Sequence, residues 1–110
     1  MALDALKLLF FALIFLSVLL EVAGDVLFKK WSIESKNMLL IAGLSIYFIG
    51  SIFWAFSLKY EYLSKSITVF TVFNLIAVAL AGVVLFKEDL SLINKLGIIA
   101  GVISVILVEI

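Results

Sequence analysis

The chain has 110 residues, of which 66% are hydrophobic and only 15% are charged, and its formal net charge is zero. A soluble domain is usually about 45–50% apolar and about 25% charged, so this composition indicates a protein that resides in lipid. The absence of Cys and His excludes a disulfide framework and removes the commonest ligands of zinc. We expect no metal, no organic cofactor, no nucleic-acid partner and no enzymatic activity.

Four continuous apolar blocks cover most of the chain, at residues 3–28, 38–58, 67–86 and 92–108. A helix needs about 20 apolar residues, within a range of about 17–25, to cross the hydrocarbon core of a bilayer. The blocks lack the alternation of apolar and polar residues that a membrane β-barrel requires. We therefore predict an all-α integral membrane protein, a single four-helix domain over residues 1–110, in which short links make neighbouring helices antiparallel.

The lysine residues set the orientation of these helices only weakly. If all four blocks cross the bilayer, three lysines lie on the side of the N-terminus and five lie on the other side. The positive-inside rule makes the lysine-richer side cytoplasmic. So small a difference fits both a single orientation and a dual topology, in which copies insert in opposite directions.

Glu21 is the only charged residue between Lys7 and Asp25, in the first apolar block. A charged side chain at the centre of a membrane helix costs about 2.5–3.5 kcal/mol on insertion scales, and such residues usually have a function. Because residues three and four apart share a helix face, Ser17, Glu21, Gly24 and Asp25 are predicted to form one polar stripe. We interpret Glu21 as a site that binds a proton or a cation. The alternative is a carboxyl that only forms a hydrogen bond to a neighbouring helix.

Asp25 follows Glu21 by one helical turn, and its role has two interpretations. Two carboxylates at this spacing repel one another, more strongly in a low dielectric, so at least one is expected to keep its proton near neutral pH. Lys29 follows Asp25 by another turn, in the acid-before-base order that favours an ion pair. Asp25 is therefore either a second acid of the site or the ion-pair partner of Lys29.

Two aromatic residues of the second block, Tyr47 and Trp54, are predicted to line the site. An aromatic face attracts a cation by about 0.5–2 kcal/mol. Aromatic residues of membrane helices also contact lipid or pack against other helices, and that is the alternative for both residues.

The fourth block carries a stripe of small residues that favours helix association. Gly97 and Gly101 form a G-x-x-x-G step, and Ser104 continues it. Small residues let helix backbones approach closely in a membrane. We predict a dimer interface along this stripe, while packing against another helix of the same chain is the alternative.

The chemistry of Glu21 suggests a mechanism. A carboxyl group can hold a proton or a cation, but not both together. If the site opens alternately to the two sides of the membrane, entry of protons is coupled to exit of the cation. Because four helices leave little room for a solvated path, such a route is expected to need a second subunit.

The layout and one motif resemble a known transporter family. Residues 20–29, LEVAGDVLFK, are similar to the first-helix signature A-E-V-x-[GA]-x-x-x-x-K of the small multidrug resistance family, in the drug/metabolite transporter superfamily. The resemblance implies an antiparallel, dual-topology homodimer in a prokaryotic inner membrane that pairs through its fourth helix. It implies proton-coupled export of drug-like organic cations or guanidinium-type metabolites, with Glu21 as the shared site.

Two features of the sequence keep a second function open. The Gly-rich run typical of that family's third helix is missing from residues 67–76, ITVFTVFNLI. Residues 22–29 are also similar to the small subunits of lipid-linked aminoarabinose flippases. The alternative function is therefore a small, non-catalytic membrane subunit of a flippase or of a heteromeric transporter, and a heterodimer with a paralogue is the alternative to the homodimer.

Overall fold

The computed structural model describes the backbone of residues 2–109 and the side chains of residues 5–108. The described chain forms four α-helices and no strand, so the all-α prediction is confirmed. The helices are α1 (Ala2–Glu34), α2 (Asn37–Ser57), α3 (Leu63–Leu85) and α4 (Leu92–Glu109).

Three of these helices, α1, α2 and α3, are long and apolar enough to cross a membrane, while α4 is a shorter apolar helix of 18 residues. At a rise of 1.5 Å per residue, α4 is about 27 Å long. A hydrocarbon core of about 30 Å thins locally to accept a helix of this length at modest cost. The predicted apolar segments are therefore all helical, as expected for a multi-pass membrane protein.

The helix ends differ from the predicted blocks where the apolar pattern stops before the helix does. Helix α1 continues beyond residue 28 to Glu34, and α3 begins at Leu63, before residue 67. Hydrophobicity marks the lipid core, whereas a helix continues into polar sequence until a residue ends it, and the chain has no proline. Ser35 ends α1 with a positive φ of 59°, and its N–H donates to the carbonyl oxygen of Trp31 at 2.7 Å.

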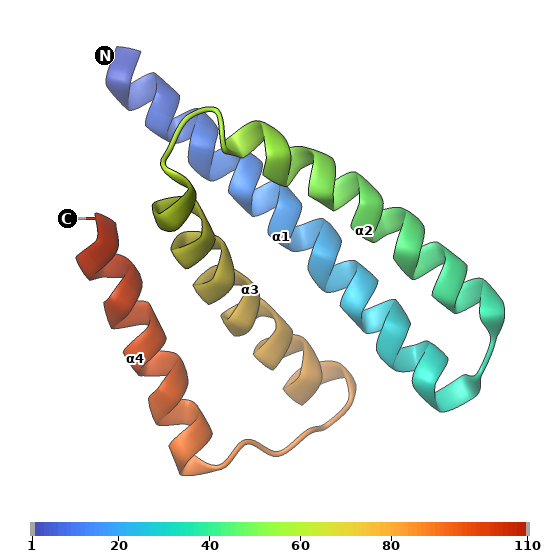
Figure 1. Ribbon diagram of the computed structural model, residues 1–110. Coiled ribbons are helices and arrows are strands. Elements are labelled where there is room, and N and C mark those ends of the chain that lie inside the picture. Colours follow the sequence, from blue (N-terminus) through green and yellow to red (C-terminus); the bar gives the residue numbers. More distant parts are fainter. Residues whose placement is uncertain (1, 110) are drawn as a thin grey trace.

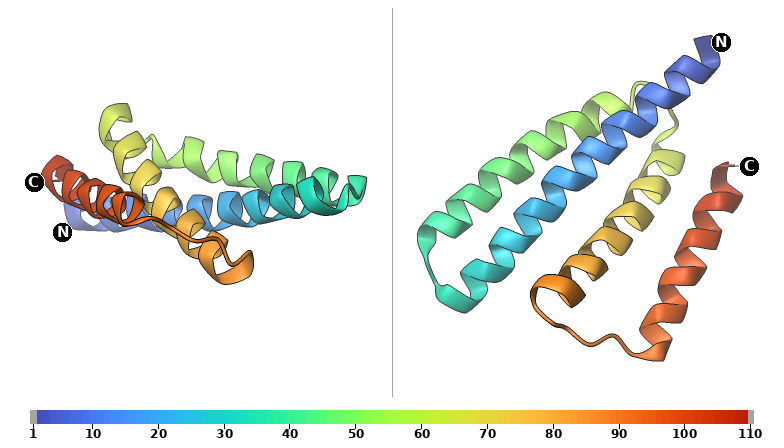
Figure 2. Two further views of the ribbon diagram at one scale, coloured as in Figure 1. Left: turned by 90° about the horizontal axis from the view of Figure 1, so that it is seen from below. Right: turned by 180° about the vertical axis from the view of Figure 1, so that it is seen from behind.

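The four helices are arranged as a broad layer (Figures 1 and 2). Helices α1 and α2 run antiparallel along their lengths, α3 lies beside α1, and α4 packs against α3. The molecule measures 48 × 34 × 19 Å along its principal axes, so it is much thinner than it is wide. The N-terminal end of α1, the α2–α3 link and the C-terminal end of α4 lie at one end of the layer.

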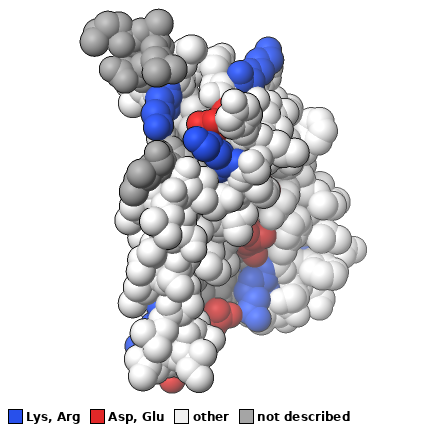
Figure 3. Space-filling model, turned by 60° about the vertical axis from the view of Figure 1, so that its left-hand side comes forward, with Lys and Arg blue, Asp and Glu red and all other residues white. Residues whose placement is uncertain are grey.

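A small core holds α1, α3 and α4 together. Its members are apolar side chains that are at most 9% exposed, namely Phe10, Ile14 and Val18 of α1, Val69 and Val72 of α3, and Val105 of α4. Most other large apolar side chains remain exposed, as expected where lipid covers the surface. On the face shown in Figure 3, the charged side chains form an upper and a lower group, with an uncharged band between them.

The close contact between α1 and α2 depends on glycines. A Cβ atom on Gly24 would lie 2.6 Å from Cδ2 of Tyr47, and one on Gly43 would lie 2.7 Å from Cε1 of Phe28. A Cβ on Gly50 would lie 3.0 Å from Cγ of Glu21. The first two distances are too short for a methyl group and the third leaves very little room for one, so the glycines make room for the side chains that form the candidate site.

Candidate functional site

Glu21 is buried in the contact between α1 and α2. Its side chain is only 9% exposed, and it lies against the Cβ-free backbone of Gly50. The hydroxyl of Ser17, one turn earlier on α1, is fully buried and lies 3.1 Å from Oε2 of Glu21. The predicted neighbours Ser17 and Glu21 are thus in direct contact.

The Ser17 hydroxyl has two acceptors within reach but only one proton. Its Oγ lies 2.8 Å from the carbonyl oxygen of Gly50 as well as 3.1 Å from Oε2 of Glu21. A hydroxyl donates one hydrogen bond and accepts others. When Glu21 is protonated, the carboxyl can donate to Ser17 while Ser17 donates to Gly50. When Glu21 is ionised, carboxylate and carbonyl compete for the single Ser17 proton.

Tyr47 of α2 joins the two acids of α1. Its hydroxyl is close enough to the carboxyl groups of both Glu21 and Asp25 to interact with them electrostatically. The ring packs on Gly24, where any side chain would collide with it, and also faces Phe28 at a centroid distance of 5.6 Å. Five of the predicted site residues therefore lie together, namely Ser17, Glu21, Gly24, Asp25 and Tyr47.

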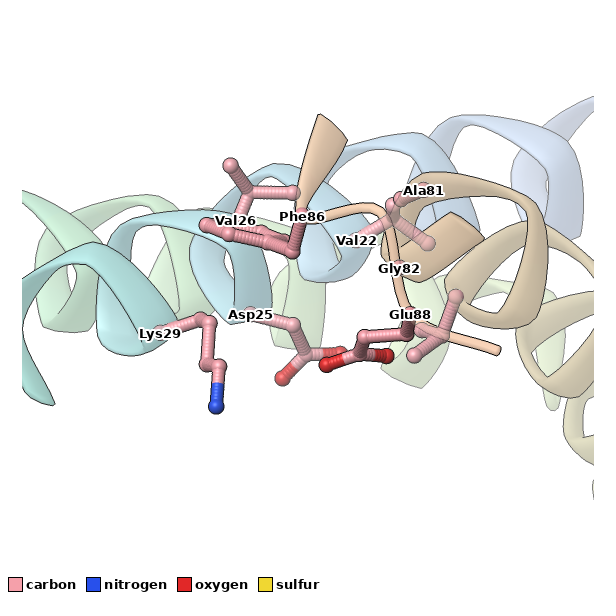
Figure 4. A pocket seen from close by; sticks show the side chains of 9 residues that line it. Val22, Asp25, Val26, Lys29, Ala81, Gly82, Phe86 and Glu88 are labelled. Carbon is pink, nitrogen blue, oxygen red and sulfur yellow. The ribbon is translucent and has the colours of Figure 1, made fainter. Parts of the chain in front are cut away.

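Asp25 opens into a separate cavity of about 140 Å³ between α1, α3 and the α3–α4 link. In Figure 4 its carboxyl group lies next to that of Glu88, a link residue that packs over the Cβ-free Gly82. Lys29 lies at the same cavity, but the described side chains form no ion pair between Asp25 and Lys29. The interpretation of Asp25 as the ion-pair partner of Lys29 is therefore not supported. Asp25 contributes to both the Glu21 cluster and this cavity.

Trp54 lies apart from the acids. Its ring packs against Phe70 of α3, with the centroids 4.9 Å apart, and it borders the apolar core. It lies four residues after Gly50 on α2, so it is one helical turn from the level of Glu21. The structure thus places Trp54 at the α2–α3 contact and not beside the two acids.

The predicted small-residue stripe of α4 does not face one partner. Gly101 lies toward Val72 of α3, 3.6 Å from the position of an added Cβ, whereas Gly97 has nothing within 4 Å of that position. The hydroxyl of Ser104 is exposed and donates to the carbonyl oxygen of Ala100, within its own helix. Gly101 therefore packs within the chain, Gly97 borders an open groove between α3 and α4 that Leu75 and Ala79 also line, and Ser104 is exposed.

Two further polar residues were not predicted to belong to the site. Glu88 lies on a polar link, where acidic residues are common, and only the fold brings it to Asp25. Asn74 could have been found in the same way as Glu21, because it too is a polar residue inside an apolar block of the sequence. Among the described side chains, no group of three or more His, Cys, Asp or Glu residues is placed to hold a metal ion.

Comparison with known proteins identifies the family. Residues 4–110 match the model of the EamA-like transporter family, which is nearly the whole chain. The chain belongs to this family. An EamA-like chain is a membrane transporter of the drug/metabolite transporter superfamily, which is the superfamily that the sequence resemblance implied. No curated protein and no solved structure gave a match.

Proposed function

We propose that this EamA-like protein is a proton-coupled antiporter that exports small organic cations. The observation that carries the proposal is the Glu21 carboxyl, 9% exposed in the middle of a membrane helix and surrounded by hydrogen-bonding groups. Ionisable residues at such positions commonly form proton relays or substrate sites. The membership of a transporter family supports the same function.

The proposed cycle uses the chemistry of Glu21 and its neighbours. A cation enters the site while Glu21 is ionised, and the carboxylate and the Tyr47 ring hold it. After the site opens to the other side of the membrane, a proton replaces the cation. Because one carboxyl cannot hold both, movement of protons in one direction drives movement of cations in the other.

The open sides of the layer favour a dimer for this cycle. The four helices form a layer that is 19 Å thick, so one chain does not enclose a path lined by Glu21. Gly97 presents a Cβ-free surface that is not covered by the described residues of the chain. We propose a homodimer that meets along Gly97 and Ser104, with the two chains antiparallel, in a prokaryotic inner membrane.

A non-transporting subunit is the second candidate function. The exposed outer face of α4, with Ile93 80% and Leu107 67% exposed, would equally suit a larger membrane partner. This function predicts that the chain is isolated with a different protein. It also predicts that substitution of Glu21 weakens that assembly without changing proton binding.

The proposal is tested by proton flux in vesicles that contain only this chain. An imposed gradient of an organic cation should move protons in the opposite direction. Tetraphenylphosphonium is not used as the cation, because it crosses lipid unaided. We expect Glu21→Gln to abolish this flux, because the amide keeps the shape of the side chain but cannot exchange a proton.

Glu34→Gln is the matched control for this experiment. Glu34 lies on the same helix but pairs with Lys36 at 3.4 Å on the exposed surface, where such pairs contribute little. This variant should retain the flux of the wild type. Undiminished flux in Glu21→Gln would contradict the proposed function.

A further inference from the structure

Asn74 of α3 has a buried oxygen without a partner. Its Oδ1 is shielded from solvent and forms no hydrogen bond with any described residue. A buried amide oxygen without a hydrogen bond costs about 1–3 kcal/mol in proteins, and buried polar atoms without partners are rare. A ligand that enters the site and donates a hydrogen bond to this oxygen would remove this cost.

The contacts between α1 and α3 place Asn74 near the level of Glu21. Val18 of α1 lines a groove with Phe73 and Ala77 of α3, on either side of Asn74 in the sequence. Further along both helices, Val22 lines the Asp25 cavity together with Val78. Nearer the start of α1, the ring centroid of Phe11 lies 6.5 Å from that of Phe73. Because α1 and α3 run in the same direction, Asn74 lies near the height of Val18, within the α1 turn that runs from Ser17 to Glu21.

The contacts of α2 give the same height independently. Trp54 of α2 packs on Phe70 of α3, and one turn from Trp54 toward the N-terminus of α2 lies Gly50, which contacts Glu21. Asn74 lies one turn from Phe70 toward the C-terminus of α3. Because α2 and α3 run antiparallel, these two steps go in the same direction, so Asn74 is level with Gly50. Residues four apart share a helix face, so Asn74 lies on the face that carries Phe70 and Val78. That face borders α2 through Phe70 and α1 through Val78.

We propose that Asn74 is a specificity-determining residue, whose Oδ1 accepts a hydrogen bond from an N–H group of the cation that binds at Glu21. This inference rests on the proposed function and names the substrate class as cations that carry N–H groups, such as primary ammonium ions. The Glu21 carboxylate attracts any cation and also accepts hydrogen bonds from an ammonium ion. A second acceptor, the amide oxygen of Asn74, increases the preference for an ammonium ion over a quaternary ammonium ion, because only the ammonium ion can donate to it.

The test compares two benzyl cations, one with three N–H groups and one with three N-methyl groups in their place. Binding of benzylammonium and of benzyltrimethylammonium is measured by calorimetry with the purified full chain in detergent. We expect Asn74→Leu, which keeps the branched shape but removes the acceptor, to weaken benzylammonium binding by about tenfold, as for loss of one hydrogen bond to a charged group. Binding of benzyltrimethylammonium should not weaken.

Three further variants make the result decisive. Asn74→Ala should show the same selective loss as Asn74→Leu, so the result does not depend on the bulk of leucine. Thr71→Val removes a hydroxyl from an exposed position one turn earlier on α3 and should leave binding of both cations unchanged. Glu21→Gln should lose binding of both, and retention of both in that variant would contradict the proposed function itself.

Equal loss of both cations in the Asn74 variants, or no loss of either, would overturn the role of Asn74. The oligomeric state of each variant is measured by light scattering in the same samples. A change of oligomeric state with an unchanged preference between the two cations would show that Oδ1 meets a second protein chain. That result would also overturn the inference.

Discussion

At the scale of single residues, the hydroxyl of Ser17 connects the protonation of Glu21 to the contact between two helices. The same Oγ lies 3.1 Å from the Glu21 carboxyl on α1 and 2.8 Å from the Gly50 carbonyl on α2. Loss of the Glu21 proton therefore introduces competition for the hydrogen bond that joins α1 to α2. A change of charge at the site would in this way alter helix packing, which alternating access requires.

Ser17→Ala tests this connection. We expect the infrared carbonyl band of protonated Glu21 to move to higher frequency, because the carboxyl loses its hydrogen-bond partner. The free energy of unfolding should fall by about 1 kcal/mol, the net contribution of an ordinary hydrogen bond. The band is assigned by its disappearance in Glu21→Gln.

Ser45→Ala is the control for the loss of a hydroxyl from a helix. The Ser45 hydroxyl is exposed and donates to the carbonyl oxygen of Ile41 at 2.9 Å, within α2. Its removal should leave the Glu21 band in place. If Ser17→Ala also left the band unchanged, the proposed contact between Ser17 and the protonated carboxyl would be wrong.

At the scale of helices, the apolar pattern predicted the four elements because each must cover the hydrocarbon core with apolar side chains. It did not predict the ends of α1 and α3, since helices continue past the lipid boundary. Helical spacing placed Ser17, Glu21, Gly24 and Asp25 on one face, which needs only local geometry. The proximity of Glu88 to Asp25 depends on contacts between helices, which the order of residues in one chain does not reveal.

Gly24→Ala tests the close packing of α1 and α2 around the site. The new methyl group would lie 2.6 Å from Cδ2 of Tyr47, so the ring must move away from the acids. Overpacking of this kind costs about 1–3 kcal/mol. We expect a lower melting temperature in detergent and weaker cation binding, measured by calorimetry.

Ala23→Val adds more bulk at the neighbouring position, which is exposed. It should change the melting temperature less than Gly24→Ala and should preserve cation binding. A Gly24→Ala protein with the stability and the affinity of the wild type would show that Tyr47 is not held against the acids by α1.

At the scale of the whole molecule, the layer of helices leaves α4 exposed on one side. A second copy would cover it, and Gly97 provides the point where backbones can approach closely. Since an EamA-like protein is a transporter, a closed path through the membrane is a functional requirement. The proposed dimer would supply it.

Gly97→Leu tests the dimer without disturbing the single chain. Nothing in the described chain lies within 4 Å of a Cβ at this position, so the fold of one chain should accept leucine. We expect the dissociation constant of the dimer to rise by about tenfold or more, because a bulky side chain prevents close approach of the helices. Sedimentation in detergent measures it, and unchanged association would place the interface elsewhere.

The competition between a proton and a cation at Glu21 is tested most directly by proton release. Purified protein in weakly buffered detergent solution is mixed with a saturating organic cation, and the change of pH is recorded. We expect the wild type to release protons on binding, in an amount that falls as the starting pH rises, and Glu21→Gln to release none. Equal release by both proteins, or binding to the wild type without any release at every pH, would contradict the competition.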